Sequence, residues 1–125
     1  MKSLDVMVLE DSDDQVLILN AILKKVGATP VHCKNAESAL QLLNSKRDFA
    51  LILVDVGLPG MSGFDFAVRL KERRIQAPVI FITGSATGAD VMQGILAGAS
   101  DYIKKPYDPA VVEARLKAKL PFSPE

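Results

Sequence analysis

Short apolar runs separated by amphipathic stretches are the main pattern of this 125-residue chain. The runs at residues 6–9, 50–54 and 79–82 are rich in β-branched residues and lack the alternation of a strand with one solvent-exposed face. They predict strands that are covered on both faces. Two weaker strands fit the same rhythm at residues 29–33 and 101–104, and we expect them at the edges of the sheet.

Apolar side chains recur at helical spacing between these runs, which predicts a helix after each strand. Residues typical of helix N-caps precede three of the helices: Asn35, Ser62 and Asp108. A fourth helix is expected at residues 87–97. Gly88 and Gly94 lie in or beside it and should make it the least stable helix, since an interior glycine costs about 1 kcal/mol relative to alanine.

Strands that alternate with helices imply an α/β fold with a parallel sheet. Five such units account for the chain, and no internal repeat, low-complexity segment or interior linker interrupts it. We therefore expect one domain over residues 1–120, followed by a C-terminal tail at residues 121–125.

Composition and charge exclude several classes of protein. With 49% hydrophobic and 24% charged residues, the chain has the proportions of a globular domain rather than of a disordered or collagen-like protein. Fifteen basic residues balance fifteen acidic ones, so no net charge attracts nucleic acid or an anionic membrane. Apolar runs stay far below the roughly 18 residues of a membrane span, and the single cysteine, Cys33, cannot form an internal disulfide. We expect a cytoplasmic protein with no membrane insertion and no direct nucleic-acid partner.

Polar side chains stand at the carboxyl ends of four of the predicted strands. They are Glu10 and Asp11 after the first strand, Asp55 after the third, Thr83 after the fourth, and Lys104 and Lys105 after the fifth. Taken singly, each has an ordinary structural explanation, such as a helix-terminal acid, a turn residue or a solvated lysine. Together they indicate a site, because open parallel α/β sheets bind ligands at the carboxyl ends of their strands.

Three carboxylates at one edge of a sheet call for a cation. Two carboxylates about 4 Å apart repel each other by about 4 kcal/mol at an effective dielectric constant of about 20. Oxygen ligands favour Mg²⁺, with Mn²⁺ as the alternative, over zinc. His32 and Cys33 are neighbours on an edge strand and therefore face opposite ways, so we expect core or surface roles for them. A metal-bound carboxylate opposite a lysine and a hydroxyl suits phosphoryl transfer, with Asp55 as the nucleophile.

Four motifs, in this order along the chain, resemble the response-regulator receiver domain of two-component signalling. They are Leu9-Glu10-Asp11 and the segments at residues 55–63, 81–84 and 97–106. The resemblance runs from the first strand to the fifth helix. It implies a flavodoxin-like fold, in which five helices flank a single doubly wound, five-stranded parallel sheet of strand order 2-1-3-4-5.

The resemblance also implies a role for each residue of the site. Asp55 is the implied phosphoacceptor. The implied Mg²⁺ ligands are Glu10, Asp11, Asp55 and the backbone carbonyl of Gly57. Gly57 is a departure from the family, because it leaves no side chain at the position that helps control the access of water to the acyl phosphate.

Residues on the fourth and fifth strands complete the implied switch. Thr83 and Lys105 are expected to contact the phosphoryl oxygens, and Lys105 is chosen over Lys104 because it directly precedes Pro106. The Lys105–Pro106 bond is implied to be cis. Tyr102 matches the aromatic residue that changes its exposure when such domains are activated.

A phosphorylation-dependent signalling switch is therefore the implied function. The phosphoryl donor would be a sensor histidine kinase or a histidine phosphotransfer protein. Such a domain is not an enzyme, since its chemistry is limited to its own phosphorylation and slow autodephosphorylation. We expect the loop at residues 84–88 and the fourth helix to move, changing a face formed by the fourth helix, fifth strand and fifth helix. A downstream protein, or a second copy in a phosphorylation-linked homodimer, would bind that face.

Three alternatives stay open from the sequence. A Mg²⁺-dependent phosphatase with an aspartyl nucleophile would carry a second acid at position 57, where this chain has glycine. A flavodoxin-like cofactor binder would have a loop rich in Ser, Thr or Gly in place of the acidic residues 10–14. A receiver that serves only for docking would be unaffected by replacing Asp55 with Asn.

Overall fold

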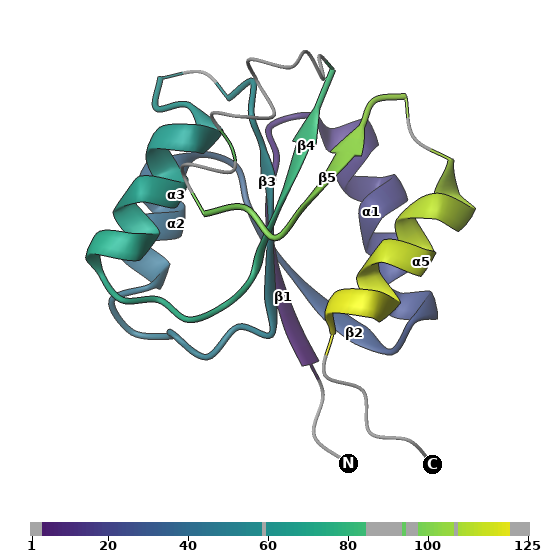
Figure 1. Cartoon of the computed structure of the whole chain (residues 1–125), viewed down its shortest axis with the longest axis horizontal. Helices are drawn as coiled ribbons and strands as arrows, with labels where there is room; N and C mark the ends of the chain where they lie inside the picture. Colours follow the sequence, from purple (N-terminus) through teal and green to yellow (C-terminus); the bar gives the residue numbers. More distant parts are fainter. Residues whose placement is uncertain (1–3, 59, 85–93, 95–97, 107, 121–125) are drawn as a thin grey trace.

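A computed structural model of the chain describes residues 4–58, 60–84, 94, 98–106 and 108–120. Its sheet has five parallel strands in the order β2-β1-β3-β4-β5 (Figure 1). The strands are β1 (Leu4–Leu9), β2 (Ala28–Cys33), β3 (Leu51–Asp55), β4 (Val79–Thr83) and β5 (Asp101–Lys104). The strand order is the one that the family resemblance implies, and β2 and β5 lie at the edges of the sheet as the sequence pattern predicts.

Three of the described helices begin where the predicted caps place them, and Ser12 caps a further one. The described part of the chain contains α1 (Asp13–Lys25), α2 (Ala36–Leu42), α3 (Gly63–Glu72) and α5 (Pro109–Lys119). Side-chain oxygens of Ser12, Asn35, Ser62 and Asp108 accept hydrogen bonds from backbone N–H groups of the respective first turns. The expected fourth helix lies outside the described residues except for Gly94, which is helical. The expected tail at residues 121–125 also lies outside them, so the domain boundary stays a prediction.

The sheet is the middle layer of three. Helices α1 and α5 cover one face, and α2 and α3 cover the other (Figure 1). Successive residues of β3 contribute to different cores: Ile52 packs in the core that contains α2 and α3, and Leu53 packs in the core that contains α1 and α5. Every residue of β3 and β4 is buried. Because both faces are covered, these strands show no alternation of polar and apolar residues.

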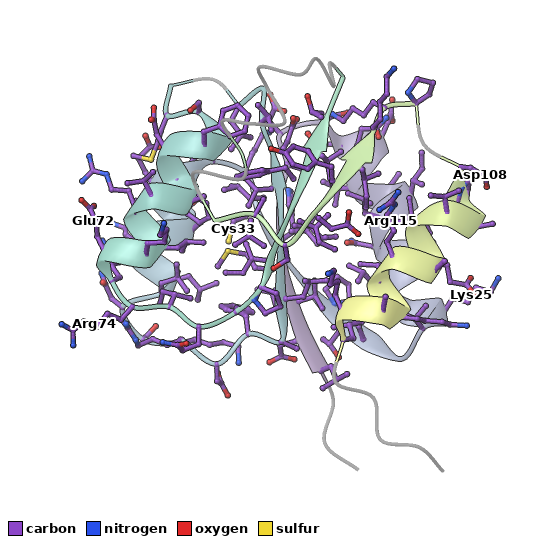
Figure 2. The ribbon with its side chains drawn as sticks, in the orientation of Figure 1. Lys25, Cys33, Glu72, Arg74, Asp108 and Arg115 are labelled. Carbon is purple, nitrogen blue, oxygen red and sulfur yellow. The ribbon has the colours of Figure 1, made fainter. Side chains whose placement is uncertain are left out.

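The edge strand β2 separates His32 from Cys33 as predicted. His32 is exposed, whereas Cys33 is buried between the sheet and the helices (Figure 2). Burial raises the pKa of the Cys33 thiol, which disfavours the reactive thiolate. Among the described residues, no helix combines the length and the apolar character needed to cross a membrane.

The strand register places the site residues at one edge of the sheet. Leu9 pairs with Val54, and the chain reaches Glu10 directly after that pair. Asp55 pairs with Ile82 and is therefore the last residue of β3. The sequence pattern ends this strand at residue 54, one residue too early, because an acidic side chain is typical of a turn whereas the backbone of Asp55 still pairs with β4.

Candidate functional site

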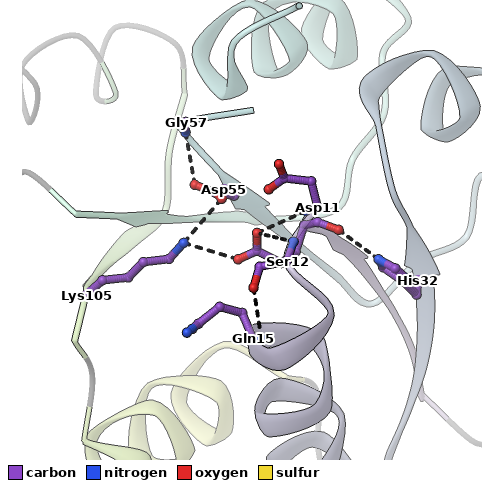
Figure 3. Close-up of polar contacts among 8 residues, drawn as sticks. Asp11, Ser12, Gln15, His32, Asp55, Gly57 and Lys105 are labelled. Atoms are coloured by element: carbon purple, nitrogen blue, oxygen red, sulfur yellow. Dashed lines mark hydrogen bonds and ion pairs between the residues drawn. The ribbon is translucent and has the colours of Figure 1, made fainter. Parts of the chain in front are cut away.

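The carboxyl ends of β1 and β3 bring three acidic side chains together (Figure 3). Each of Glu10, Asp11 and Asp55 offers one carboxylate oxygen, and these oxygens all lie within 4.8 Å of one another. Glu10 is fully buried, Asp55 is only 6% exposed, and Asp11 faces solvent. The cluster therefore has a buried floor and one open side through which a ligand can approach.

Lys105 supplies the positive charge of the site. Its Nζ atom lies 3.2 Å from Glu10 Oε1 and 3.2 Å from Asp55 Oδ2 (Figure 3). Its backbone N–H donates to the carbonyl of Thr83 at 2.7 Å, so the end of β4 fixes where the lysine leaves β5. Lys104 is exposed, and the Lys105–Pro106 peptide bond is cis, as expected.

Backbone N–H groups orient the two buried carboxylates. Gly57 donates to Asp55 Oδ1 at 2.9 Å, while Asp11 and Ser12 donate to Glu10 Oε2 at 3.0 and 3.2 Å. Local sequence explains these bonds, since each donor lies one or two residues after its acceptor. A buried carboxylate that accepts backbone hydrogen bonds is held in one orientation.

His32, on the neighbouring strand β2, holds the backbone at Glu10. Its Nε2 atom donates to the backbone carbonyl of Glu10 at 2.8 Å (Figure 3). The opposite facing of His32 and Cys33 predicts a core or surface role for His32 and does not indicate this bond. The signal that was available is the pairing of the first two strands, which puts the residue before Cys33 beside the end of β1.

The pKa values of Glu10 and Lys105 are both raised in this cluster. Burial, followed by the neighbouring Asp55 carboxyl, raises the pKa of Glu10 from its ordinary 4.5 to about 7. Burial alone would lower the pKa of Lys105, but the charges of Asp55 and Glu10 outweigh it, and the pKa is raised. A fixed ammonium group therefore stands beside a carboxyl that is still partly protonated near neutral pH.

Thr83 and Tyr102 occupy different positions relative to this cluster. Thr83 is the last residue of β4 and is buried beside the strand ends. Tyr102 lies on β5, half-buried, with its ring packed against Phe81 at a centroid distance of 5.7 Å. The structure thus joins Lys105 to the acids, while Tyr102 belongs to a packed aromatic region of the sheet.

The donor set suits a hard divalent cation. All three side chains offer a carboxylate oxygen, and neither His32 nor Cys33 belongs to the cluster. Two buried carboxylates fixed by backbone N–H groups form a preorganised floor, and the exposed Asp11 leaves space for water ligands. The residues therefore fit Mg²⁺.

Comparison with known proteins identifies the family. The family model of the response regulator receiver domain matches residues 6–117. The chain belongs to the receiver-domain family. Receiver domains bind Mg²⁺ at an acidic pocket, and Glu10, Asp11 and Asp55 form an acidic pocket in this receiver domain. Membership in this family decides against the phosphatase and flavodoxin-like alternatives.

Curated relatives of this receiver domain are named as transcriptional regulators. The transcriptional regulatory protein AfsQ1 of Streptomyces coelicolor is 35% identical over 91% of this chain and 50% of that protein. The transcriptional regulatory protein YvrH of Bacillus subtilis is 31% identical over 96% of this chain and 50% of its own length. The chain thus spans about half the length of the curated relatives it matches.

Solved structures show the same fold. The chemotaxis protein CheY4 of Vibrio cholerae superimposes with a TM-score of 0.88 at 22% identity, over 95% of this chain and all of that one. A receiver domain of a signal transduction histidine kinase from Syntrophus aciditrophicus has a TM-score of 0.82 at 32% identity, over 94% of this chain and 90% of that one.

Proposed function

We propose that this receiver domain is a signalling switch in which Asp55 accepts a phosphoryl group. The observation that carries the proposal is the position of the Asp55 carboxylate at the floor of the acidic cluster, 3.2 Å from the Lys105 ammonium. A buried nucleophile with a cation-binding cluster on one side and a fixed positive charge on the other is what phosphoryl transfer needs.

The donor in this proposal is a phosphohistidine of a sensor histidine kinase or of a histidine phosphotransfer protein. A carboxylate oxygen of Asp55 attacks phosphorus, the P–N bond breaks, and its electron pair stays on the imidazole nitrogen of the donor. The product is an acyl phosphate on Asp55. No general base is needed, because a carboxylate nucleophile has no proton to lose when it attacks.

Residues around Asp55 hold the reacting groups in place. Glu10, Asp11, Asp55 and the Gly57 carbonyl would hold Mg²⁺, which when bound neutralises the negative charge of the incoming phosphoryl group. The Gly57 N–H orients one carboxylate oxygen of Asp55. Lys105 is placed to leave its carboxylate partners and bind a phosphoryl oxygen.

The switch depends on contacts that exist only in the phosphorylated state. Thr83 and Lys105 would each form a charge-assisted hydrogen bond to the phosphoryl oxygens. Two such bonds, at about 1.5–3 kcal/mol each, come near the roughly 5.5 kcal/mol that moves a two-state population from 1:99 to 99:1. Phosphorylation is therefore strong enough to change the shape of the chain and its partner-binding face.

The output of the switch belongs to the same proposal. The partner-binding face would be formed by the segment around Gly94 together with β5 and α5, and it would bind a downstream protein or a second copy of the chain. The names of the curated relatives point to control of transcription as the pathway. The match to a kinase receiver domain favours a phosphorelay as the other setting.

Intact-mass analysis tests the proposal. Incubation with a small phosphodonor and Mg²⁺ should add the mass of one phosphoryl group to the wild type and to Asp65→Asn, whose carboxylate is exposed on α3. Asp55→Asn should gain no mass, and chelation of Mg²⁺ should abolish the wild-type adduct. An adduct on Asp55→Asn would overturn the proposal, and no adduct on any variant would favour the docking-only alternative.

A further inference from the structure

Gly94 faces the side chain of Tyr102 at a distance that leaves no room for any other residue. A Cβ atom built on Gly94 would lie 1.3 Å from Tyr102 Oη and 2.4 Å from Tyr102 Cζ. Gly94 is buried, and its carbonyl accepts a hydrogen bond from the Ala99 N–H at 2.9 Å, which ties it to the segment before β5. The phenol end of Tyr102 thus occupies the volume that a side chain at position 94 would need.

The backbone of Gly94 does not itself require glycine. Its φ lies outside the left-handed region, in contrast to Gly98, whose φ is +96°. Glycine at a helical position costs about 1 kcal/mol relative to alanine. The structure offers one compensation for that cost, which is the space that Gly94 leaves for Tyr102.

The Tyr102 ring also contacts a second aromatic ring. Phe81 on β4 packs against it with ring planes inclined at 58°, and Phe64 packs edge-on against Phe81 with centroids 5.0 Å apart. The three rings form an aromatic column, Phe64–Phe81–Tyr102, that starts at the first turn of α3. A Cβ atom at Gly94 would also lie 3.1 Å from Phe81 Cδ2, so the Phe81 ring borders both Tyr102 and Gly94, and the half-buried Tyr102 has its open side toward solvent.

Tyr102 is at the same time part of the molecular surface. It lines a cavity of about 350 Å³ between β5 and α5, together with Lys104, Pro106, Val111 and Arg115. Val111 is 47% exposed and gives the cavity an apolar side chain, and the charged residues that line it are Lys104, Arg115 and the acidic Asp108. The position of the Tyr102 ring therefore contributes to the shape of this surface.

We propose that Gly94 is a positioning residue for Tyr102. The missing side chain at position 94 admits the ring to its place on Phe81, and any larger residue would drive the ring outward. The consequence for a partner at the β5–α5 cavity rests on the proposed function, whereas the position of the ring can be measured without phosphate or Mg²⁺. Failure of the inference is therefore distinguishable from failure of the switch.

Tyrosine fluorescence provides the first test, because the chain has two tyrosines and no tryptophan. In a Tyr107→Phe background, Tyr102 is the only emitter. Acrylamide quenching of Tyr102 should rise in Gly94→Ala toward the value of the urea-unfolded chain. Gly84→Ala is the matched control, since a Cβ there meets nothing within 4 Å, and its quenching should equal that of the parent. Unchanged quenching in Gly94→Ala would overturn the inference.

A double-mutant cycle provides the second test and covers a variant that does not fold. Tyr102→Leu removes the two atoms that the new Cβ would meet most closely, while Phe81 Cδ2 at 3.1 Å remains in both backgrounds. Gly94→Ala should therefore lose more stability to urea in the Tyr102 protein than in the Tyr102→Leu protein. If Gly94→Ala fails to fold alone, Tyr102→Leu should restore folding. An equal loss of stability in both backgrounds would show that Gly94 serves another contact.

Discussion

Lys105 Nζ lies 3.2 Å from Asp55 Oδ2 and bridges this carboxylate to that of Glu10. The two carboxylates are almost completely buried, while a quarter of the lysine side chain is exposed. One ammonium group is therefore shared by two acids that have few water molecules to solvate them. A divalent cation in the same cluster would also compensate the carboxylate charges. The lysine and the cation should therefore partly replace each other in stabilising the fold.

Replacing Lys105 with Met tests whether the stability of the protein depends on the ammonium group between the two carboxylates. Without Mg²⁺, Lys105→Met should lose about 1–3 kcal/mol of unfolding free energy, because buried charged groups lose their hydrogen-bond donor. Saturating Mg²⁺ should recover most of the loss. Urea unfolding followed by circular dichroism, with and without Mg²⁺, measures both effects.

Lys104 is the matched control for this experiment. It is the preceding residue and is exposed, and among the described residues it contacts no carboxylate. Lys104→Met should change neither the unfolding free energy nor its response to Mg²⁺. A similar loss in both variants, or a loss that Mg²⁺ does not recover, would contradict the bridging role of Lys105.

The protonation of Glu10 predicts a pH dependence of Mg²⁺ binding. The pKa of this buried carboxyl is raised to about 7, with Asp55 and Lys105 as the charged groups beside it. A proton on Glu10 competes with the cation, so Mg²⁺ affinity should increase as the pH rises from about 6 to 8. Calorimetric titration at several pH values measures the affinity. Glu10→Gln should bind Mg²⁺ more weakly, with a flatter profile.

Glu10 should also affect the stability of the metal-free protein in a defined direction. The folded state holds its proton more tightly than the unfolded chain, whose glutamate titrates near 4.5. Between these values the folded state binds more protons, so the contribution of Glu10 is fully present below pH 4.5 and is lost as the pH rises through 7. Glu37→Gln, on the exposed side of α2, should retain this pH dependence, and Glu10→Gln should lack it.

Local sequence was sufficient to predict the strands, the caps and the residues at the carboxyl edge of the sheet. Parallel strands bring their ends together whatever the details of packing, so the alternation of strands and helices alone places Glu10, Asp55 and Lys105 at one edge. The strand order and the roles of single residues needed the resemblance to a family, because periodicity does not specify which strands are neighbours.

Contacts between distant segments could not be predicted in this way. The hydrogen bond from His32 to the Glu10 carbonyl joins residues 22 positions apart. The close approach of Tyr102 to Gly94 depends on how the side chains pack, which the sequence pattern does not specify. A glycine that makes room for a neighbour looks, in sequence, like a glycine that weakens a helix. The sequence pattern therefore predicts only that Gly94 weakens its helix and does not indicate the contact with Tyr102.

Asn20 on α1 predicts a stabilising substitution. Its Oδ1 atom is buried and has no hydrogen-bond partner in the described part of the structure. Asn20→Leu, which keeps a similar shape, should raise the unfolding free energy by about 1 kcal/mol, because an unsatisfied polar group is removed from the interior. Asn44→Leu is the contrast, since Asn44 Oδ1 accepts from Arg73 at 3.2 Å and its loss should not stabilise the fold. Urea unfolding measures the stability of both variants. A loss of stability in Asn20→Leu would contradict the view that Asn20 Oδ1 is an unsatisfied buried group.

Gly63 predicts a link between the packing of α3 and the reactivity of Asp55. A Cβ atom at Gly63 would lie 2.8 Å from the Asp55 carbonyl oxygen and 2.9 Å from Val56 Cα, so Gly63→Ala must shift the end of β3 or the start of α3. The variant should lose about 1–3 kcal/mol of stability, as overpacked sites do.

Gly63→Ala should also be phosphorylated more slowly than the wild type at equal folded fraction, because the displaced backbone carries Asp55 away from Lys105. Gly57→Ala is the control for adding a methyl group near Asp55 without a steric clash. Its Cβ would lie 3.7 Å from Asp55 Oδ1, an ordinary van der Waals distance, so the stability of this variant should be unchanged. A Gly63→Ala protein phosphorylated at the wild-type rate would show that α3 does not position Asp55.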